Sequence, residues 1–206
     1  MRGKLKIERG PAAVSPELVL RAYAEGLFPM AEGREDPRLF WIDPDWRAIL
    51  PMESFHVPRR LASTMRRGVF EVRFDTAFET VVEGCAGPRA RQTDTWISHQ
   101  IETLYLALHR LGHAHSVECW QEGRLVGGLY GVALGGAFFG ESMFGRVRDA
   151  SKVALASTHE HLKAQGFALF DVQFWTPHLA QFGAVEIPRG EYLTRLRAAL
   201  ELEVTF

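Results

Sequence analysis

Residues 115–141 have the sequence HSVECWQEGRLVGGLYGVALGGAFFGE, which predicts three strands in succession. Strands are expected at 115–121 and 124–134, and they are joined by Glu122-Gly123, a pair typical of a tight hairpin turn. A third strand is expected at about 136–141. The framework of this chain is therefore expected to be a β-sheet.

Helices are predicted upstream of this sheet. Residues 69–74 alternate as a strand, and Thr76 with Glu79 predicts a capping box at the start of a helix. A second helix is expected over 98–111, because its apolar residues recur at a spacing of three and four. Gly112 is its expected end.

Downstream, one helix and one strand follow. Asp149 is expected to cap a helix that ends at Gly166, and the apolar run 167–175 predicts a strand. The order is then strand, two helices, three strands, helix and strand. This order favours an α+β or α/β sheet with helices packed on it.

The first quarter of the chain has a different pattern. Ser15-Pro16 predicts the start of a short helix that stops at Gly26. Five prolines interrupt residues 28–58, which indicates short strands and turns. We therefore expect a small N-terminal lobe over residues 1–57 and a main domain over residues 58–206.

Composition excludes several classes of protein. The chain has 206 residues, 47% of them hydrophobic, and a net charge of -1, as in an ordinary soluble globular protein. No apolar run is long enough to cross a membrane. The basic start of the sequence is followed by no apolar stretch, so we expect no signal peptide. Two cysteines without metal spacing indicate a reduced, cytoplasmic protein. Three histidines lie close together in the sequence and could be considered metal ligands: His109, His113 and His115. No acid or cysteine completes a ligand set there, and we expect no metal.

Positive charge is concentrated in one segment. Twenty of the 24 cationic residues are arginine, and five of them lie between His56 and Phe74, where Glu71 is the only acid. The five are Arg59, Arg60, Arg66, Arg67 and Arg73. A local basic patch can bind nucleic acid even when the total charge is near zero. A solvated helix face is the alternative explanation.

Polar residues interrupt the apolar strand 167–175. Side chains two residues apart share a face, so Asp171 and Gln173 should point the same way. The opposite face should carry Phe170, Val172 and Phe174. A carboxylate there is either a general base with Gln173 orienting it, or a structural aspartate that pairs with an arginine or caps a helix.

A second candidate lies at the end of a glycine-rich run. Glycines in a strand mark bulges or a close backbone approach, and Glu141 follows several of them. We expect Glu141 at the mouth of an apolar pocket; an exposed acid at a strand end is the alternative. Leu129, Phe138 and Met143 could line such a pocket or simply pack in the core.

Eight segments, in order, resemble the leucyl/phenylalanyl-tRNA–protein transferases. They are 22–30 AYAEGLFPM, 95–97 TWI, 112–118 GHAHSVE, 125–132 LVGGLYGV, 139–144 FGESMF, 150–152 ASK, 171–173 DVQ and 178–184 HLAQFGA. Together they cover roughly residues 18–196, so the match is specific.

The resemblance implies an acetyltransferase-like (GNAT) catalytic domain behind a small N-terminal α/β lobe. It also implies transfer of Leu or Phe from aminoacyl-tRNA to the N-terminal Arg or Lys of a protein. Because an apolar pocket discriminates poorly among large apolar groups, some transfer of Met is expected as well. Such transfer would mark that protein for degradation under the N-end rule in the bacterial cytoplasm. No metal, coenzyme or membrane is implied, and a monomer is expected.

Residue roles follow from the matching positions. Asp171 and Gln173 would be the catalytic pair facing the acceptor amine, with Glu141 near the aminoacyl ester. Trp96 and Trp41 would hold the terminal adenosine. The pocket for the Leu or Phe side chain would be lined by Leu129, Phe138, Met143, Leu155 and Phe170. The acceptor stem of the tRNA would contact Arg59, Arg60, Arg66 and Arg67.

Two positions depart from the family pattern. The usual W-W-S-P segment is Trp41-Ile42-Asp43-Pro44 here, so one of its two tryptophans is missing. Thr158 replaces a large apolar residue of the pocket, which could alter the preference between Leu and Phe.

Two other functions remain open at this point. An acetyl-CoA-dependent N-acetyltransferase would share the fold, but residues 145–150, GRVRDA, lack the repeated glycines of a pyrophosphate loop. A non-catalytic tRNA-binding or degradation-adaptor protein would leave Asp171 and Gln173 without a chemical role.

Overall fold

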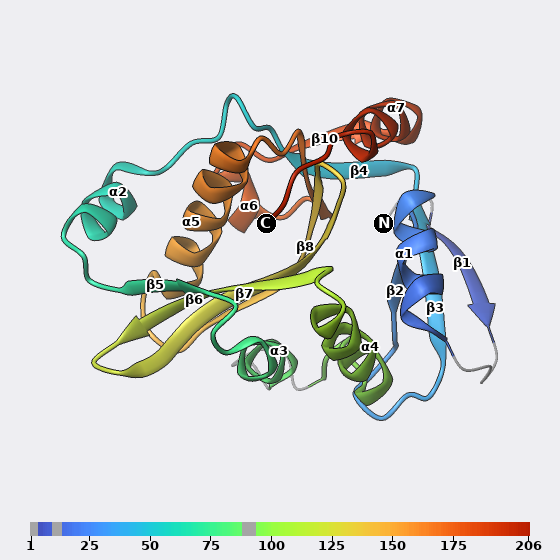
Figure 1. Ribbon diagram of the computed structural model, residues 1–206, viewed down its shortest axis with the longest axis horizontal. Helices are drawn as coiled ribbons and strands as arrows, with labels where there is room; N and C mark the ends of the chain where they lie inside the picture. Colours follow the sequence, from blue (N-terminus) through green and yellow to red (C-terminus); the bar gives the residue numbers. More distant parts are fainter. Residues whose placement is uncertain (1–3, 10–13, 88–93) are drawn as a thin grey trace.

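The computed structural model describes residues 4–9, 14–87 and 94–206, and it builds them around two β-sheets (Figure 1). Their elements in chain order are β1 (Lys4–Arg9), α1 (Pro16–Ala24), β2 (Phe28–Met30), β3 (Leu39–Pro44), β4 (Trp46–Leu50), α2 (Arg59–Arg66), β5 (Glu71–Phe74), α3 (Phe78–Ala86), α4 (His99–Arg110), β6 (Ala114–Gln121), β7 (Arg124–Leu134), β8 (Ala137–Gly145), α5 (Ala150–Gln165), β9 (Leu169–Gln173), α6 (Pro177–Ala180), β10 (Val185–Pro188) and α7 (Arg189–Leu200). The α+β class is thus confirmed.

The expected hairpin is the centre of the larger sheet. β6 and β7 are antiparallel, and Glu122 and Gly123 between them both have positive φ, 50° and 73°. Two such residues form a turn whose twist matches that of the strands. β8 continues to Gly145, past the expected end at 141, because it stays paired with β7 as far as Gly127. A Cβ on Gly127 would lie 2.6 Å from that of Ala150, so this glycine lets α5 approach the sheet.

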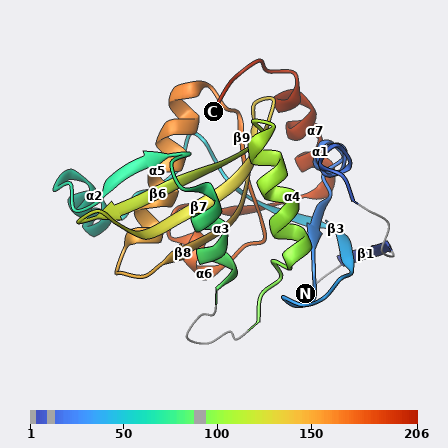
Figure 2. The ribbon, with the colours of Figure 1, turned by 60° about the horizontal axis from the view of Figure 1, so that its bottom comes forward.

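The larger sheet is mixed and is covered on both faces. Its strand order is β10-β4-β9-β8-β7-β6-β5, and only the pair β8–β9 is parallel among the described strands. Helix α5 connects these two strands and packs on one face of the sheet, while α3 and α4 pack on the other (Figures 1 and 2). Two hydrophobic clusters result, one on each side.

Strand β9 separates these clusters nearly as its sequence predicts. Leu169 belongs to the cluster on the side of α3 and α4, and Phe170 and Val172 belong to the cluster on the side of α5. The expectation that Phe174 follows Phe170 is wrong, because Phe174 packs against the first cluster. Gln173 has a φ of 55°, which ends the strand and turns the chain before Phe174.

A small sheet of order β1-β3-β2 forms the N-terminal part. Ser15 caps α1 as expected, since its hydroxyl accepts from the N–H of Leu18. β4 follows β3 directly but joins the larger sheet between β10 and β9. The two sheets therefore separate after Pro44, and the domain boundary at residue 57 stays a prediction.

One predicted helix cap is wrong, and a second is confirmed in position but not in its hydrogen bond. Thr76 and Glu79 form no capping box, because Glu118 of β6 accepts from the N–H groups of Thr76 and Ala77 and from the Thr76 hydroxyl. Asp149 does occupy the N-cap position of α5, but its φ is 68° and its side chain makes no capping hydrogen bond. A carboxylate from strand β6 thus accepts hydrogen bonds from the backbone N–H groups at the start of α3.

In the described part of the chain, no helix is long and apolar enough to cross a membrane.

Candidate functional site

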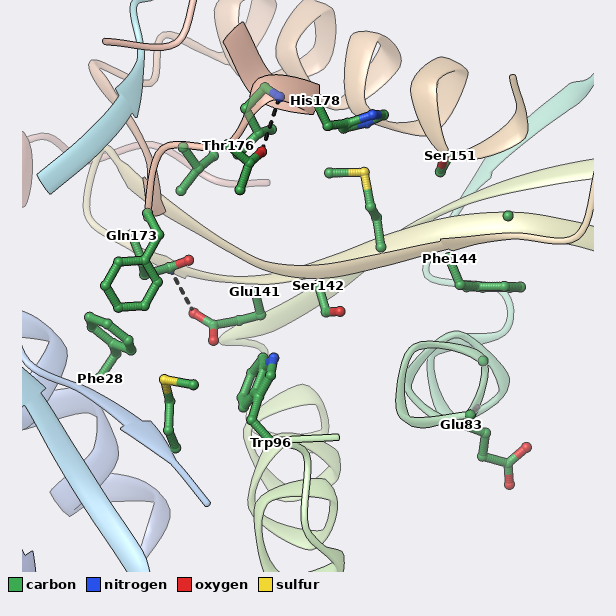
Figure 3. Close-up of a pocket in the computed structure, with 18 of the residues that line it drawn as sticks. Phe28, Glu83, Trp96, Glu141, Ser142, Phe144, Ser151, Gln173, Thr176 and His178 are labelled. Carbon is green, nitrogen blue, oxygen red and sulfur yellow. Dashed lines mark hydrogen bonds between the residues drawn. The ribbon is translucent and has the colours of Figure 1, made fainter. Parts of the chain in front are cut away.

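A cavity of about 950 Å³ opens between the small sheet, α3 and the ends of β8 and β9 (Figure 3). Its polar wall includes Glu141 and Gln173, and its apolar wall includes Trp96, Met143 and Phe174. The remaining lining residues are Phe28, Met30, Glu83, Gly84, Gly87, Ser142, Phe144, Gly145, Arg146, Ser151, Val172, Thr176, His178 and Leu179. The cavity has the mixed character of a ligand site.

Glu141 and Gln173 meet on the wall of this cavity. They come from neighbouring parallel strands, β8 and β9, and Gln173 Nε2 donates to Glu141 Oε1 at 3.2 Å (Figure 3). The positive φ of Gln173 is uncommon for a residue with a side chain. Such strain is typical of functional sites, because the surroundings must hold the residue in place.

Two tyrosines hold the Glu141 carboxylate from behind. The Tyr23 hydroxyl donates to Oε1 at 2.7 Å, and the Tyr105 hydroxyl donates to Oε2 at 2.8 Å. Burial raises the pKa of Glu141 to about 7, and the Asp171 charge also raises it, while the tyrosine hydrogen bonds and Arg47 lower it. Glu141 can therefore gain or lose a proton near neutral pH.

Asp171 lies behind the cavity wall and does not face the cavity. Its side chain is buried, and both oxygens accept from the Arg47 guanidinium, with Oδ2 2.7 Å from Nη2. Oδ2 also accepts from the Tyr192 hydroxyl at 2.7 Å, and Oδ1 accepts from the Gln173 N–H at 2.8 Å. The expected orientation toward an acceptor amine is thus corrected, because these partners occupy both carboxylate oxygens.

Arg47 is the buried cation of this network. Its guanidinium carbon lies 4.5 Å from the centroid of the Phe28 ring and 4.6 Å from that of Tyr192. Nη1 donates to the Gly26 carbonyl at 2.9 Å. Burial alone would lower the pKa of Arg47, but the Asp171 charge outweighs it and raises that pKa. A charged pair held in this way fixes the end of β9 where Gln173 turns toward the cavity.

Sequence reasoning did not find the partners of the two carboxylates. Tyr23, Arg47, Tyr105 and Tyr192 are far from β8 and β9 in the chain, and only the fold brings them together. Arg47 could have been noticed in the sequence as a candidate buried cation, because it is the one charged residue of the strand Trp46–Leu50, with the sequence WRAIL. The alternative in which Asp171 pairs with an arginine is the arrangement observed.

The two tryptophans are in different environments. Trp96 lines the cavity beside Glu141 (Figure 3). Trp41 is only 4% exposed and packs in the core from β3, so the structure does not bring it to the cavity. Of these two tryptophans, only Trp96 is placed to stack on a flat ligand in the cavity.

Only one of the five expected pocket residues lines the cavity. Met143 does so, and it packs against a core cluster that contains the other four. These are fully or almost fully buried and do not line the cavity; they are Leu129, Phe138, Leu155 and Phe170. Thr158 is also buried, and its hydroxyl donates to the Ala154 carbonyl within α5. Their role in side-chain recognition stays a prediction.

The predicted basic residues lie on or next to α2. Arg59, Arg60, Arg66 and Arg67 are exposed, and no ion pair to them is found among the described residues. The helix packs against α5 and lies at the opposite end of the molecule from the small sheet (Figure 1). These side chains are therefore available to an anionic partner.

The histidines are explained by packing and pairing. His109 stacks on Phe78 with a centroid distance of 4.1 Å, and His115 Nδ1 lies 2.8 Å from Asp75 Oδ2. Outside residues 1–3, 10–13 and 88–93, no group of three potential ligands could hold a metal ion.

Comparison with known proteins identifies the family. Residues 49–197 match the leucyl/phenylalanyl-tRNA protein transferase family, and residues 12–45 match the N-terminal domain of that family. The leucyl/phenylalanyl-tRNA–protein transferase of Phenylobacterium zucineum is 62% identical over 188 residues, which cover 91% of this chain and 85% of that protein. That of Nitrobacter winogradskyi is 55% identical over 199 residues, covering 97% and 88%.

The search of solved structures gave a much weaker likeness. L-PGS from Bacillus licheniformis has a TM-score of 0.40 and 13% identity, covering 75% of this chain and 51% of that one. The two matched family regions together span most of the chain, and both relatives match it at high identity. The chain belongs to the leucyl/phenylalanyl-tRNA protein transferase family.

Proposed function

We propose that this protein transfers Leu or Phe from aminoacyl-tRNA to the N-terminal Arg or Lys of acceptor proteins. The observation that carries the proposal is the cavity wall on which Glu141 and Gln173 meet beside Trp96 and Met143. Names of close relatives support the class of reaction. The product would carry a new N-terminal Leu or Phe, and we propose that it enters degradation by the N-end rule in the bacterial cytoplasm.

The reaction needs an amine held against an activated ester. The acceptor nitrogen attacks the ester carbonyl carbon, an N–C bond forms, and the C–O bond to the tRNA ribose breaks. Orientation alone can lower such a barrier by about 7–11 kcal/mol. The Oε1 atom of Gln173 can accept a hydrogen bond from the attacking amine while its Nε2 donates to Glu141.

Asp171 would act as a positioning residue in this reaction. Its hydrogen bond from the Gln173 N–H supports the strained backbone that aims the Gln173 side chain at the cavity. Its own oxygens are occupied by Arg47 and Tyr192. Asp171 and Gln173 would therefore act as a pair, and of the two only Gln173 would touch the substrate.

The aminoacyl end of the tRNA would lie along the apolar wall. Stacking of an adenine on Trp96 is worth about 1–3 kcal/mol. Met143 would contact the Leu or Phe side chain, and the buried residues packed against Met143 would complete the pocket. Because each methylene adds only about 1–3 kcal/mol of discrimination, some transfer of Met is expected.

The body of the tRNA would be held by the exposed arginines of α2. Arginine side chains bind phosphates without reading sequence, and their binding weakens as salt rises. We further propose that the main domain has an acetyltransferase-like fold, a proposal with which the mixed sheet between two helical layers is compatible.

The function is tested by incubation with tRNA charged with radiolabelled Leu, Phe or Met. Peptides starting with Arg, Lys, Met or Asp serve as acceptors, and labelled acetyl-CoA in place of the tRNA serves as the competing donor. Label from Leu- or Phe-tRNA, with weaker label from Met-tRNA, is expected on the Arg and Lys peptides and on neither of the other two peptides. Label from acetyl-CoA, or no label from any tRNA, would contradict the proposal.

A further inference from the structure

Tyr23, Tyr105 and Glu141 form a closed ring of three short oxygen contacts. Tyr23 Oη lies 2.7 Å from Glu141 Oε1, Tyr105 Oη lies 2.8 Å from Oε2, and the two phenol oxygens lie 2.6 Å apart. The three side chains come from α1, α4 and β8, which are distant in sequence. Glu141 lines the cavity, whereas both phenols are buried behind it.

The hydrogens of this ring can be counted. Burial, and then the Glu141 charge, raises the pKa of both phenols well above the usual value, so each keeps its proton. Two phenols supply two hydrogens for three oxygen contacts. When Glu141 is ionised, both hydrogens point to its carboxylate; when it is protonated, its own hydrogen allows every contact to carry one. In the ionised state the contact between the two phenol oxygens therefore carries no hydrogen, and all three contacts are complete only when Glu141 is protonated. Both phenols remain in contact with the carboxyl group in either state.

We propose that Glu141 is the proton acceptor for the attacking amine and that Tyr23 and Tyr105 are the positioning residues that hold its carboxyl group in place. This inference rests on the proposed function. The acceptor α-ammonium group gives one proton to the Glu141 carboxylate, and the free amine attacks the ester carbonyl carbon. As the C–O bond breaks, Glu141 gives this proton to the leaving ribose oxygen. The carboxylate then takes the second proton from the new amide nitrogen and releases it to water, so Glu141 ends ionised.

The other groups around Glu141 influence its environment, but none of them can serve as the proton acceptor in its place. Gln173 is an amide that neither gains nor loses a proton near neutral pH. Asp171 is engaged by Arg47 and Tyr192 and is closed off from the cavity. The titratable and charged groups around the ring are Tyr23 of α1, Arg47 of β4, Tyr105 of α4, Tyr130 of β7, Asp171 of β9 and Tyr192 of α7. Glu141 is the one of these carboxylates that a substrate in the cavity can reach.

The test is the pH dependence of single-turnover transfer from Phe-tRNA to an Arg-starting peptide, from about pH 6 to about pH 9. Tyr23→Phe and Tyr105→Phe each remove one hydrogen bond that lowers the pKa of Glu141. Each should move the midpoint of the profile upward by about one pH unit, with the rate at high pH retained. Tyr130→Phe is the matched control: its ring packs edge-on against Tyr105 at 5.2 Å, and its midpoint should not move.

A second readout separates this inference from the proposed function. The infrared difference between the protein and its Glu141→Gln variant reports the protonated Glu141 carboxyl group directly, without any transfer. Its titration should move upward in either tyrosine variant, and a titration unchanged in both would overturn the inference. An equal loss of transfer at every pH in both variants would overturn it as well. Absence of transfer by the unaltered protein, with the infrared shift present, would instead overturn the proposed function.

Discussion

Asp171 and Glu141 are carboxylates on the neighbouring strands β9 and β8, and their partners differ in charge. Asp171 faces the full positive charge of Arg47 at 2.7 Å and is closed off from the cavity. Glu141 is held by the neutral donors Tyr23 and Tyr105 and lines the cavity. Burial raises its pKa to about 7.

This difference suits the two carboxylates to different roles, one structural and one chemical. A carboxylate paired with a guanidinium is fixed in charge and position, and it therefore makes a good anchor. A carboxylate held by phenols can exchange a proton near neutral pH. Gln173 links the two, because its N–H donates to Asp171 and its side chain donates to Glu141. Four predictions follow, from the largest expected effect to the smallest. The first three test this difference between Asp171 and Glu141.

Asp171→Asn should have the largest effect on folding. It leaves the Arg47 guanidinium buried without its counter-charge, which should lower the free energy of unfolding by about 3–5 kcal/mol. Urea unfolding followed by circular dichroism measures it. Asp43→Asn is the control: Asp43 pairs with the half-exposed Arg189, and its loss should cost less than about 1 kcal/mol. Equal losses for the two variants would contradict the anchor role.

Glu141→Gln should change how stability depends on pH. The folded protein holds the Glu141 proton up to about pH 7, whereas the usual pKa is 4.5. The resulting stabilisation is fully present below pH 4.5 and is lost as pH rises through about 7. Relative to the variant, the unaltered protein should lose up to about 3 kcal/mol between about pH 5 and pH 8. A constant difference in urea unfolding would show that Glu141 titrates normally.

Tyr192→Phe tests whether the hydrogen bonds of Asp171 are independent of those of Glu141. It removes one hydrogen bond to a charged carboxylate, which should cost about 1.5–3 kcal/mol of unfolding free energy. The pH midpoint of transfer should stay in place, because Glu141 keeps its own donors. If the midpoint moves as far as it does in Tyr23→Phe, the two networks are not separate.

The exposed arginines should give the smallest effect on stability. Arg66→Glu with Arg67→Glu should change the free energy of unfolding by less than about 0.5 kcal/mol, since both side chains are exposed. It should raise the concentration of aminoacyl-tRNA required and reduce the dependence of binding on salt. Binding titrations at several salt concentrations measure this; an unchanged salt dependence would leave these residues as a solvated helix face.

The sheet was predictable from local signals. The Glu122-Gly123 turn and the strands on either side of it depend on neighbouring residues, and the predicted hairpin is confirmed. The capping box at Thr76 is wrong, because Glu118 from another strand accepts the hydrogen bonds there. Asp149 does occupy the N-cap position, but its backbone is left-handed and its side chain makes no capping hydrogen bond. Local patterns do not contain a partner that lies about forty residues away in the chain.

The site was predictable only in part. Glu141 and Gln173 stand out as polar residues among apolar strands, and both line the cavity. Their supporting residues come from α1, β4, α4 and α7, so nothing near them in the sequence identifies these partners. Asp171 stands out for the same reason as Gln173, yet its orientation depends on Arg47, which is 124 positions away.

The central claim is that Glu141 takes part in the chemistry while Asp171 supports the site. The most direct test is single-turnover transfer of labelled Phe from tRNA to an Arg-starting peptide by the Glu141→Gln variant, with binding of Phe-tRNA measured alongside. The account predicts transfer that is slower by about 10²–10⁴-fold above about pH 8, where Glu141 is ionised, and a smaller difference at lower pH, with binding of Phe-tRNA retained. Transfer at the rate of the unaltered protein would contradict it.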